Sequence, residues 1–165
     1  MISFLVVALF AAAQKNSVPA SRPQVLLDAD KMAGAFLKKD YNTFVKYTYP
    51  GLIEKAGGRE SFLMKFESSI KELESEGAKC DSVIISEPSQ MVTCYGMLQC
   101  VLKQEMVVSY TGQKSYKDIT YLIAFSGDDG KSWTFLNGAR RTLLEIVKEF
   151  PRVCGNLPLD EKYIH

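Results

Sequence analysis

The stretch from Gln99 to Asn137 constrains the fold of this 165-residue chain more than any other, because it predicts three consecutive antiparallel strands. Apolar and polar residues alternate in its first third, as they do in a half-buried strand. A second alternating run follows Gly112-Gln113, and the leading glycine favours a two-residue hairpin turn. That turn fixes which residues face each other across the hairpin. The expected pairs are Cys100 with Phe125, Leu102 with Ile123, Gln104 with Tyr121, and Met106 with Ile119.

A second turn, from Gly127 to Lys131, leads into the third strand. Its composition suits a three-residue loop in which Gly130 adopts the left-handed conformation. The Asp-Asp-Gly inside it resembles part of a calcium loop, but the further oxygen ligands and the distal Glu of such a loop are missing. A plain turn is therefore expected. Across this hairpin the expected pairs are Phe125 with Trp133, Ile123 with Phe135, and Tyr121 with Asn137.

The rest of the chain predicts helices placed before and after the strands. Apolar residues recur at three-and-four spacing in the helical segments, and Asp40, Pro50-Gly51, Gly57-Gly58, Gly77 and Pro151 are start and stop signals. Helices first and antiparallel strands afterwards indicate an α+β fold. The expected helices are Gln24–Lys39, Tyr41–Tyr47, a segment between Gly58 and Gly77, and Arg141–Phe150, while Asp81–Ser86 and Gln90–Tyr95 are expected to form a further strand pair.

Composition excludes several classes of function. Twenty basic and nineteen acidic residues almost cancel, so no basic surface is expected for nucleic acid and no polybasic run for an anionic membrane. Hydrophobic residues make up 47% of the chain, which excludes a disordered protein. The length suits one domain with a substantial core.

The N-terminus predicts export. Residues from Ile2 to Ala13 are apolar or small except for Ser3, and the run ends in three alanines. This pattern is typical of a signal peptide, although the positively charged start is absent, and a buried helix is the alternative. Cleavage after Ala13 would leave a periplasmic or extracellular protein without a membrane span, preceded by a flexible segment from 14 to 24.

Four cysteines leave several disulfide states open. Cys94 and Cys100 lie too far apart along one strand to bond to each other. Unless Gly96 breaks the strand, two complete pairings remain, Cys80–Cys94 with Cys100–Cys154, or Cys80–Cys100 with Cys94–Cys154. Free buried thiols are the favoured state, because apolar strand faces suit them. The cysteine spacing matches no metal site, and the single histidine is the terminal His165.

A set of short motifs is spread along the chain: Lys39-Asp40-Tyr41, Tyr47 to Pro50, Gly57-Gly58, Tyr121 to Ser126, Asp129 to Phe135, and Pro151 with Leu157-Pro158. Together these motifs resemble a known family, the uncharacterised exported branch of the nuclear-transport-factor-2-like (NTF2-like) superfamily, which has a cystatin-like cone. The resemblance covers about residues 25–160 and leaves a polar tail at 161–165. It implies N-terminal helices packed on a curved antiparallel sheet, a short C-terminal helix, and a cavity beside the first helix.

The expected strand pairing places Gln104, Tyr121 and Asn137 in one row on the helix-facing side of the sheet. Polar groups that converge in an apolar concavity predict a ligand site, and the structural alternative is that each is an ordinary satisfied core or cap group. Tyr47 belongs to an aromatic cluster, with Phe36, Phe44, Tyr41 and Tyr49, that is expected to line the core and the cavity.

No catalytic residue and no cofactor are predicted. Asp118, the best carboxylate on a strand, has the parity of the outward face, and no Ser-His or Cys-His pair occurs inside the domain. We therefore expect a non-enzymatic domain that binds a small apolar or amphipathic ligand or a protein partner. The alternatives are an isomerase- or dehydratase-like enzyme in which Tyr121 donates to an oxyanion, and a homodimer formed through the sheet face, where Val101 and Val107 are apolar.

Overall fold

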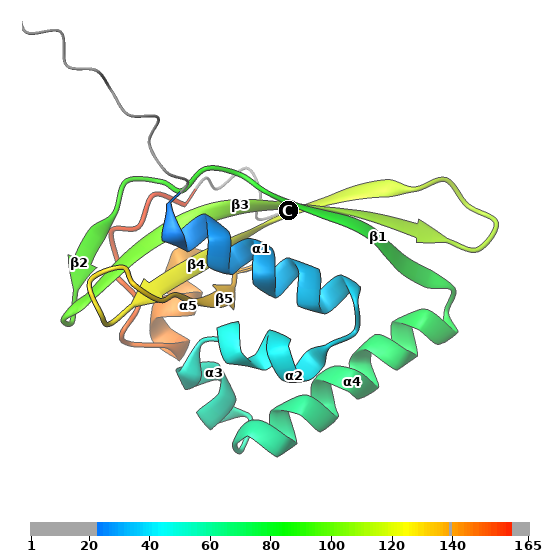
Figure 1. The fold of residues 1–165 in the computed structure, drawn as a ribbon, viewed down its shortest axis with the longest axis horizontal. Coiled ribbons are helices and arrows are strands. Elements are labelled where there is room, and N and C mark those ends of the chain that lie inside the picture. The colour runs from blue at the N-terminus through cyan, green and yellow to red at the C-terminus, as the bar shows by residue number, and fades with distance from the viewer. Residues whose placement is uncertain (1–22, 139, 160–165) are drawn as a thin grey trace, which may run out of the picture.

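The structure, a computed structural model, describes residues 23–138 and 140–159 (Figure 1). The expected signal peptide at 1–13, residues 14–22 of the expected flexible segment, and the polar tail at 161–165 lie outside the described residues. Within the described part no helix is both long enough and apolar enough to cross a bilayer.

Helices form the first part of the described chain, as the apolar spacing predicts. Asp40 caps α2 by accepting a hydrogen bond from the Thr43 amide at 3.0 Å. Pro50 is expected to end the helical segment, but it begins a further helix instead, because proline suits the first turn of a helix. The helices are α1 (Gln24–Leu37), α2 (Tyr41–Phe44) with a 3₁₀ turn over Val45–Tyr47, α3 (Pro50–Lys55) and α4 (Arg59–Ser75).

Five strands of the described chain form one antiparallel sheet in the order β1-β3-β4-β5, with β2 also paired to β3. β1 and β2 lie one after the other along the same edge of β3. The prediction that these two segments pair with each other is therefore wrong. The strands are β1 (Ala78–Ile85), β2 (Val92–Cys94), β3 (Met97–Tyr110), β4 (Tyr116–Ser126) and β5 (Thr134–Asn137), and α5 (Leu143–Glu149) follows them behind a Thr142–Glu145 capping box.

The register of both hairpins differs by one residue from the prediction. The turn after β3 is longer than expected, with Gly112 (φ 75°) in its middle and the Gln113 amide bonded to the Tyr110 carbonyl at 3.0 Å. Gly130 has the predicted positive φ of 84°, but β5 pairs one residue later. The observed partners are Cys100 with Ala124, Leu102 with Leu122, Gln104 with Thr120, Met106 with Asp118, Phe125 with Thr134, Ile123 with Leu136, and Leu122 with Asn137.

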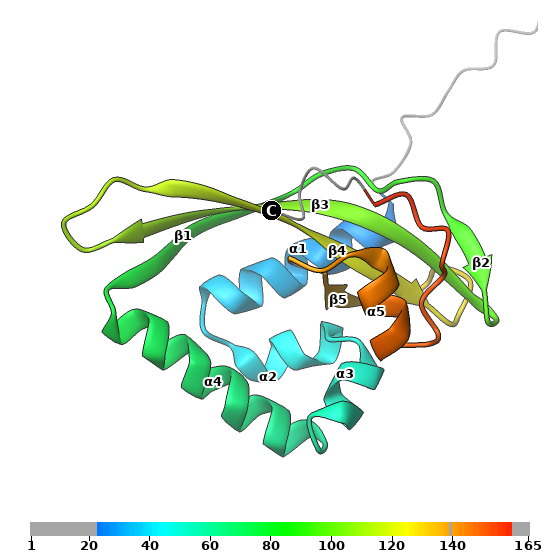
Figure 2. The same ribbon diagram turned by 180° about the vertical axis from the view of Figure 1, so that it is seen from behind.

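A one-residue shift reverses the face on which each side chain of β4 lies. Leu122 and Ala124 pack toward α1, while Tyr121, Ile123 and Phe125 pack in a second core with α5 and the C-terminal segment. Figures 1 and 2 show α1 and α5 on opposite sides of the sheet. β4 is therefore covered on both faces. The predicted helix-facing position of Tyr121 is wrong for this reason.

The α+β class is confirmed, with N-terminal helices on the concave side of a strongly curled antiparallel sheet, a half-barrel, and a short C-terminal helix (Figure 2).

One disulfide joins the C-terminal segment to the sheet. Cys94 of β2 is bonded to Cys154, while Cys80 and Cys100 are free thiols. Neither complete pairing is present, and free thiols are right for two cysteines and wrong for the other two. Next to the disulfide, the buried Gln99 side chain donates to the Arg152 carbonyl at 2.8 Å and accepts from the Cys154 amide at 2.9 Å. These bonds hold residues 152–154 against the convex face of the sheet.

Candidate functional site

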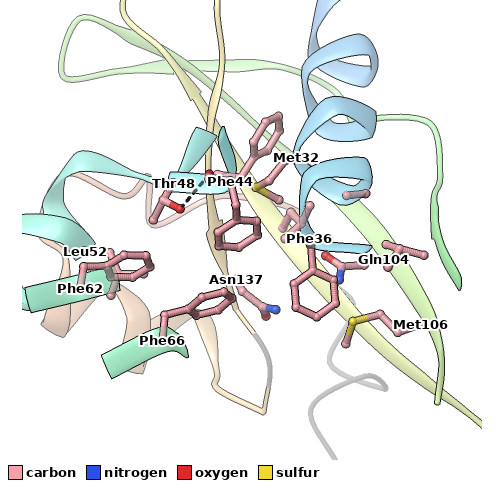
Figure 3. A pocket seen from close by; sticks show the side chains of 14 residues that line it. Met32, Phe36, Phe44, Thr48, Leu52, Phe62, Phe66, Gln104, Met106 and Asn137 are labelled. Carbon is pink, nitrogen blue, oxygen red and sulfur yellow. Dashed lines mark hydrogen bonds between the residues drawn. The ribbon is translucent and has the colours of Figure 1, made fainter. Parts of the chain in front are cut away.

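A cavity of about 250 Å³ lies between the helices and the concave face of the sheet (Figure 3). The half-barrel curls around α1, while α2, α3 and α4 contribute the opposite wall. Every helix before the sheet and four of its strands contribute to the lining. The lining residues are Met32, Ala33, Phe36, Phe44, Thr48, Leu52, Phe62, Phe66, Val83, Gln104, Met106, Leu122, Phe135 and Asn137.

Aromatic side chains form most of the helical wall. The Phe44 and Phe66 rings are stacked with centroids 4.7 Å apart, and the Phe62 and Phe66 rings lie nearly parallel at 5.8 Å. Phe36 meets Phe44 at 6.0 Å. Phe62 and Phe66 are one turn apart on α4, so the helix places both rings on the same side. The wall therefore offers a continuous apolar surface of ring faces and edges.

Gln104 is the buried polar group of the sheet wall. Only 7% of the residue is exposed, and its amide makes no hydrogen bond with any described residue. Figure 3 shows the amide turned from β3 toward the Phe36 ring and Asn137. A buried amide normally has hydrogen-bond partners. The Gln104 side chain is therefore free to bond a group that enters the cavity.

The other two polar residues of the lining differ from Gln104. Thr48 donates to the Phe44 carbonyl at 3.3 Å, which uses its hydroxyl within the backbone of its own segment. Asn137 is exposed at the end of β5 and has an interaction partner of its own. Gln104 is thus the strongest polar feature of the cavity.

Thr120 lies directly across from Gln104 on β4, and the sequence analysis does not identify it as a site residue. It is 3% exposed, and its hydroxyl has no hydrogen-bond partner within the described structure. Directly paired residues of neighbouring strands lie on the same face, and so do residues two apart on one strand. Thr120 therefore shares the concave face with Gln104 and Leu122. Thr120 does not line the cavity itself, so its unpaired hydroxyl lies next to Gln104, whose side chain does.

Tyr121 is not part of this cavity. Its hydroxyl donates to the Arg141 carbonyl, and its ring packs so closely on Gly138 that a Cβ there would lie 2.2 Å from a ring carbon. Burial in this second core raises the pKa of the phenol. The structure thus gives Tyr121 the satisfied core environment that the sequence analysis weighs as its alternative.

The rest of the predicted aromatic cluster divides among three locations. Phe36 and Phe44 line the cavity, and Tyr41 meets the Phe66 ring edge-on at 5.5 Å. Tyr47 is half-buried and packs against the core under α1 without lining the cavity. Tyr49 stacks on Phe125 at 4.2 Å in the second core.

None of the described residues that line the cavity carries a charge. Asp118 pairs with Met106 and therefore lies on the concave face of the sheet, so its predicted outward position is wrong. Asp118 lines an adjoining outer groove that shares Phe36 and Met106 with the cavity and also includes Lys39, Glu74 and Arg140. Lys39 and Glu74 form an ion pair at 2.6 Å. The charges thus lie outside the cavity, next to one of its walls.

A metal site is not evident in the described part of the chain, which holds no cluster of three metal-ligating side chains. The predicted plain turn at Asp128 is confirmed. Its carboxylate accepts from the Lys131 and Ser132 amides at 3.1 and 2.9 Å and from the Ser126 and Ser132 hydroxyls. These bonds hold the pKa of Asp128 at about 2.

The sequence contains a signal that β4 is buried on both faces, but none for its register. The run from Tyr121 to Phe125 is apolar without interruption, which is typical of a strand buried on both faces. Such a strand does not reveal its register by alternation. A pairing based on the alternation of apolar and polar residues therefore predicts Tyr121, and not Thr120, opposite Gln104.

Comparison of the chain with protein-family models, with curated proteins and with solved structures found no match.

Proposed function

We propose that this protein is a binding domain that encloses a small, mainly apolar molecule in the cavity between α1, α2, α4 and the sheet. The observation that carries the proposal is a cavity of about 250 Å³ walled by stacked aromatic rings and methionines, with the Gln104 amide as a polar group in its lining. Apolar pockets with a few polar groups are the usual form of a small-molecule site.

The volume limits the size of the ligand. An engineered apolar cavity of about 150 Å³ accommodates benzene, which has six non-hydrogen atoms. On the same scale this cavity holds a molecule of about ten non-hydrogen atoms. A larger ligand would extend into the outer groove past Phe36 and Met106.

The isomerase- or dehydratase-like alternative has less support. Such chemistry needs an acid or base within hydrogen-bond reach of the substrate, and the lining of the cavity carries neither a carboxylate nor an imidazole. Tyr121, the proposed oxyanion donor, lies on the other face of the sheet. An enzyme of this class would have to use Asp118 from the outer groove.

We further propose that the domain is an exported member of the NTF2-like superfamily. Helices on the concave face of a curled antiparallel sheet support the family, and the Cys94–Cys154 disulfide supports an oxidising compartment. Protein recovered from outside the cytoplasm, denatured without reductant, should release two titratable thiols and start after Ala13. Four free thiols and an intact N-terminus would contradict export.

A homodimer through the sheet face has weaker support than ligand binding. Val101, one of the two apolar residues behind that hypothesis, is 8% exposed and packs within the second core. Of these two residues, only the half-buried Val107 is left to contribute apolar surface to a dimer interface. Sedimentation showing a concentration-independent dimer would reverse this ranking.

Binding is tested with butylbenzene, an apolar probe of suitable size, by thermal unfolding of the full chain. A ligand that binds only the folded state at about ten times its Kd adds about 1.4 kcal/mol of stability, which corresponds to a rise in Tm of about 3–6 °C. Ala33→Leu places a larger side chain in the cavity and should abolish the rise. Ser68→Leu, on the exposed side of α4, should keep it. An unchanged Tm of the wild type at saturating probe would contradict the proposal.

A further inference from the structure

Gln104 is a polar residue in the lining of the apolar cavity, and Thr120 lies beside it on the next strand without lining the cavity itself. Their backbones face each other across β3 and β4, and both residues lie on the concave face. Gln104 is 7% exposed and Thr120 is 3% exposed. The Thr120 hydroxyl is buried without a hydrogen-bond partner in the described structure, and the Gln104 amide lines the cavity. The Thr120 hydroxyl is costly in the free protein, because buried polar groups are stabilised only when they are bonded.

The chemistry of this pair is neutral. An amide offers two donors and an acceptor, and a hydroxyl offers one donor and two lone pairs. The Thr120 hydroxyl can bond one end of the Gln104 amide when that amide turns, which leaves the other end directed at the ligand. A ligand hydroxyl can bond either end of the amide, because it both donates and accepts. A ligand carbonyl only accepts, so it can bond only the NH₂ end.

A charged ligand does not fit this position. The described lining has no cationic or anionic side chain. Transfer of an ionised carboxylate or ammonium into such surroundings is strongly unfavourable without an opposite charge or a full set of hydrogen bonds. Lys39 and Arg140 belong to the outer groove, and Lys39 is already paired with Glu74.

We infer that Gln104, supported by Thr120, is the polar subsite of the cavity and selects uncharged ligands that carry one hydroxyl or carbonyl group on an apolar body of about ten non-hydrogen atoms. This inference rests on the proposed binding function and adds the class of ligand. The apolar body packs against the aromatic wall of Phe44, Phe62 and Phe66, and the polar group lies at Gln104.

Three probes of similar size separate the possibilities: para-propylphenol, butylbenzene and para-ethylbenzoate. Their affinities for the folded full chain are measured by calorimetric titration at pH 7. We expect the phenol to bind about 5- to 10-fold more tightly than butylbenzene, as one net hydrogen bond would give. The charged benzoate should bind at least about 10-fold more weakly than the phenol.

Variants assign the preference to the subsite. Gln104→Leu should retain butylbenzene binding and lose the preference for the phenol, and Thr120→Val should reduce that preference. Gln90→Leu makes the same chemical change at an exposed position and should leave all three affinities unchanged. Circular dichroism confirms that each variant is folded.

The outcomes distinguish the two proposals. Equal binding of phenol and butylbenzene, a preference that survives Gln104→Leu, or tightest binding of the benzoate would overturn the polar subsite while leaving a binding cavity. Failure of all three probes to bind the folded wild type would overturn the proposed function itself.

Discussion

Thr120 is the residue whose position most changes the view of this molecule. By sequence parity it belongs with outward polar residues, and in the structure it lies on the helix-facing side beside Gln104. Its hydroxyl is buried without a partner. A buried hydroxyl that makes no hydrogen bond does not stabilise the fold, which is a reason to consider a functional role for it.

Replacement of Thr120 by valine should stabilise the ligand-free protein. Valine keeps the branched shape and the strand preference while removing an unpaired buried hydroxyl. We expect a gain of about 1 kcal/mol in the free energy of unfolding, measured by urea denaturation. Thr93→Val, the same change at an exposed position of β2, should alter stability by less than about 0.5 kcal/mol. A loss of stability in Thr120→Val would show that the hydroxyl has a partner.

At the scale of the elements, local signals predict helices and strands well, and the pairing of strands less well. Asp40 and Gly57-Gly58 mark helix boundaries because caps and glycines act on neighbouring backbone. The register of the first hairpin is accompanied by a contact with a distant segment, since the Thr111 amide bonds the Gly77 carbonyl at 3.1 Å. Thr111 thereby leaves the hairpin ladder. The alternation of apolar and polar residues within the strands does not predict that bond.

The same limit applies to the candidate site. Gln104 and Asn137 are identified correctly as lining residues, because β3 and β5 retain the predicted faces. Tyr121 is not, because the single shift in β4 reverses its face. A continuous apolar strand gives equal support to both registers, so the covering of the second face by α5 and the C-terminal segment decides between them.

The turn between β4 and β5 should respond to acid through Asp128. The folded-state pKa of about 2 lies below the usual value of 3.8, so the stabilisation is present above about pH 4 and is lost as the pH falls through about 2. The protection of the Lys131 and Ser132 amides, measured as their hydrogen-exchange rate relative to that of an unstructured amide at the same pH, should therefore fall in that window. Asp128→Asn should weaken this protection already at pH 7, while Asp129→Asn should not. Equal exchange in the two variants would contradict the role of Asp128.

The disulfide should contribute strongly to holding the C-terminal segment. Cys94 and Cys154 are 60 residues apart in sequence, and the chain-entropy model gives about 4 kcal/mol for a loop of that size, with about 2–4 kcal/mol typical. We expect the Cys94→Ala/Cys154→Ala double variant to lose stability in that range in urea. Cys80→Ala, which removes a half-buried free thiol, should lose less than about 1 kcal/mol. An unchanged midpoint in the double variant would contradict this account of the disulfide.

For the molecule as a whole, two cores share one sheet and serve different purposes. The convex side is filled by α5, the Tyr121 ring and the C-terminal segment, and it is fixed by the disulfide and the Gln99 hydrogen bonds. The concave side is closed around α1 but leaves a cavity toward α2 and α4. A rigid outer core thus supports an inner wall that is not completely packed. This division favours a ligand site on the concave side.

The most direct test is the location of bound para-propylphenol by intermolecular nuclear Overhauser effects in the full chain. We predict contacts from the ring protons beside the phenol hydroxyl to the Gln104 side-chain amide, and from the propyl chain to the rings of Phe62 and Phe66. Contacts to Tyr121 or Ile146, which lie in the core on the other face of the sheet, or a bound probe without any contact to Gln104, would contradict the proposed site.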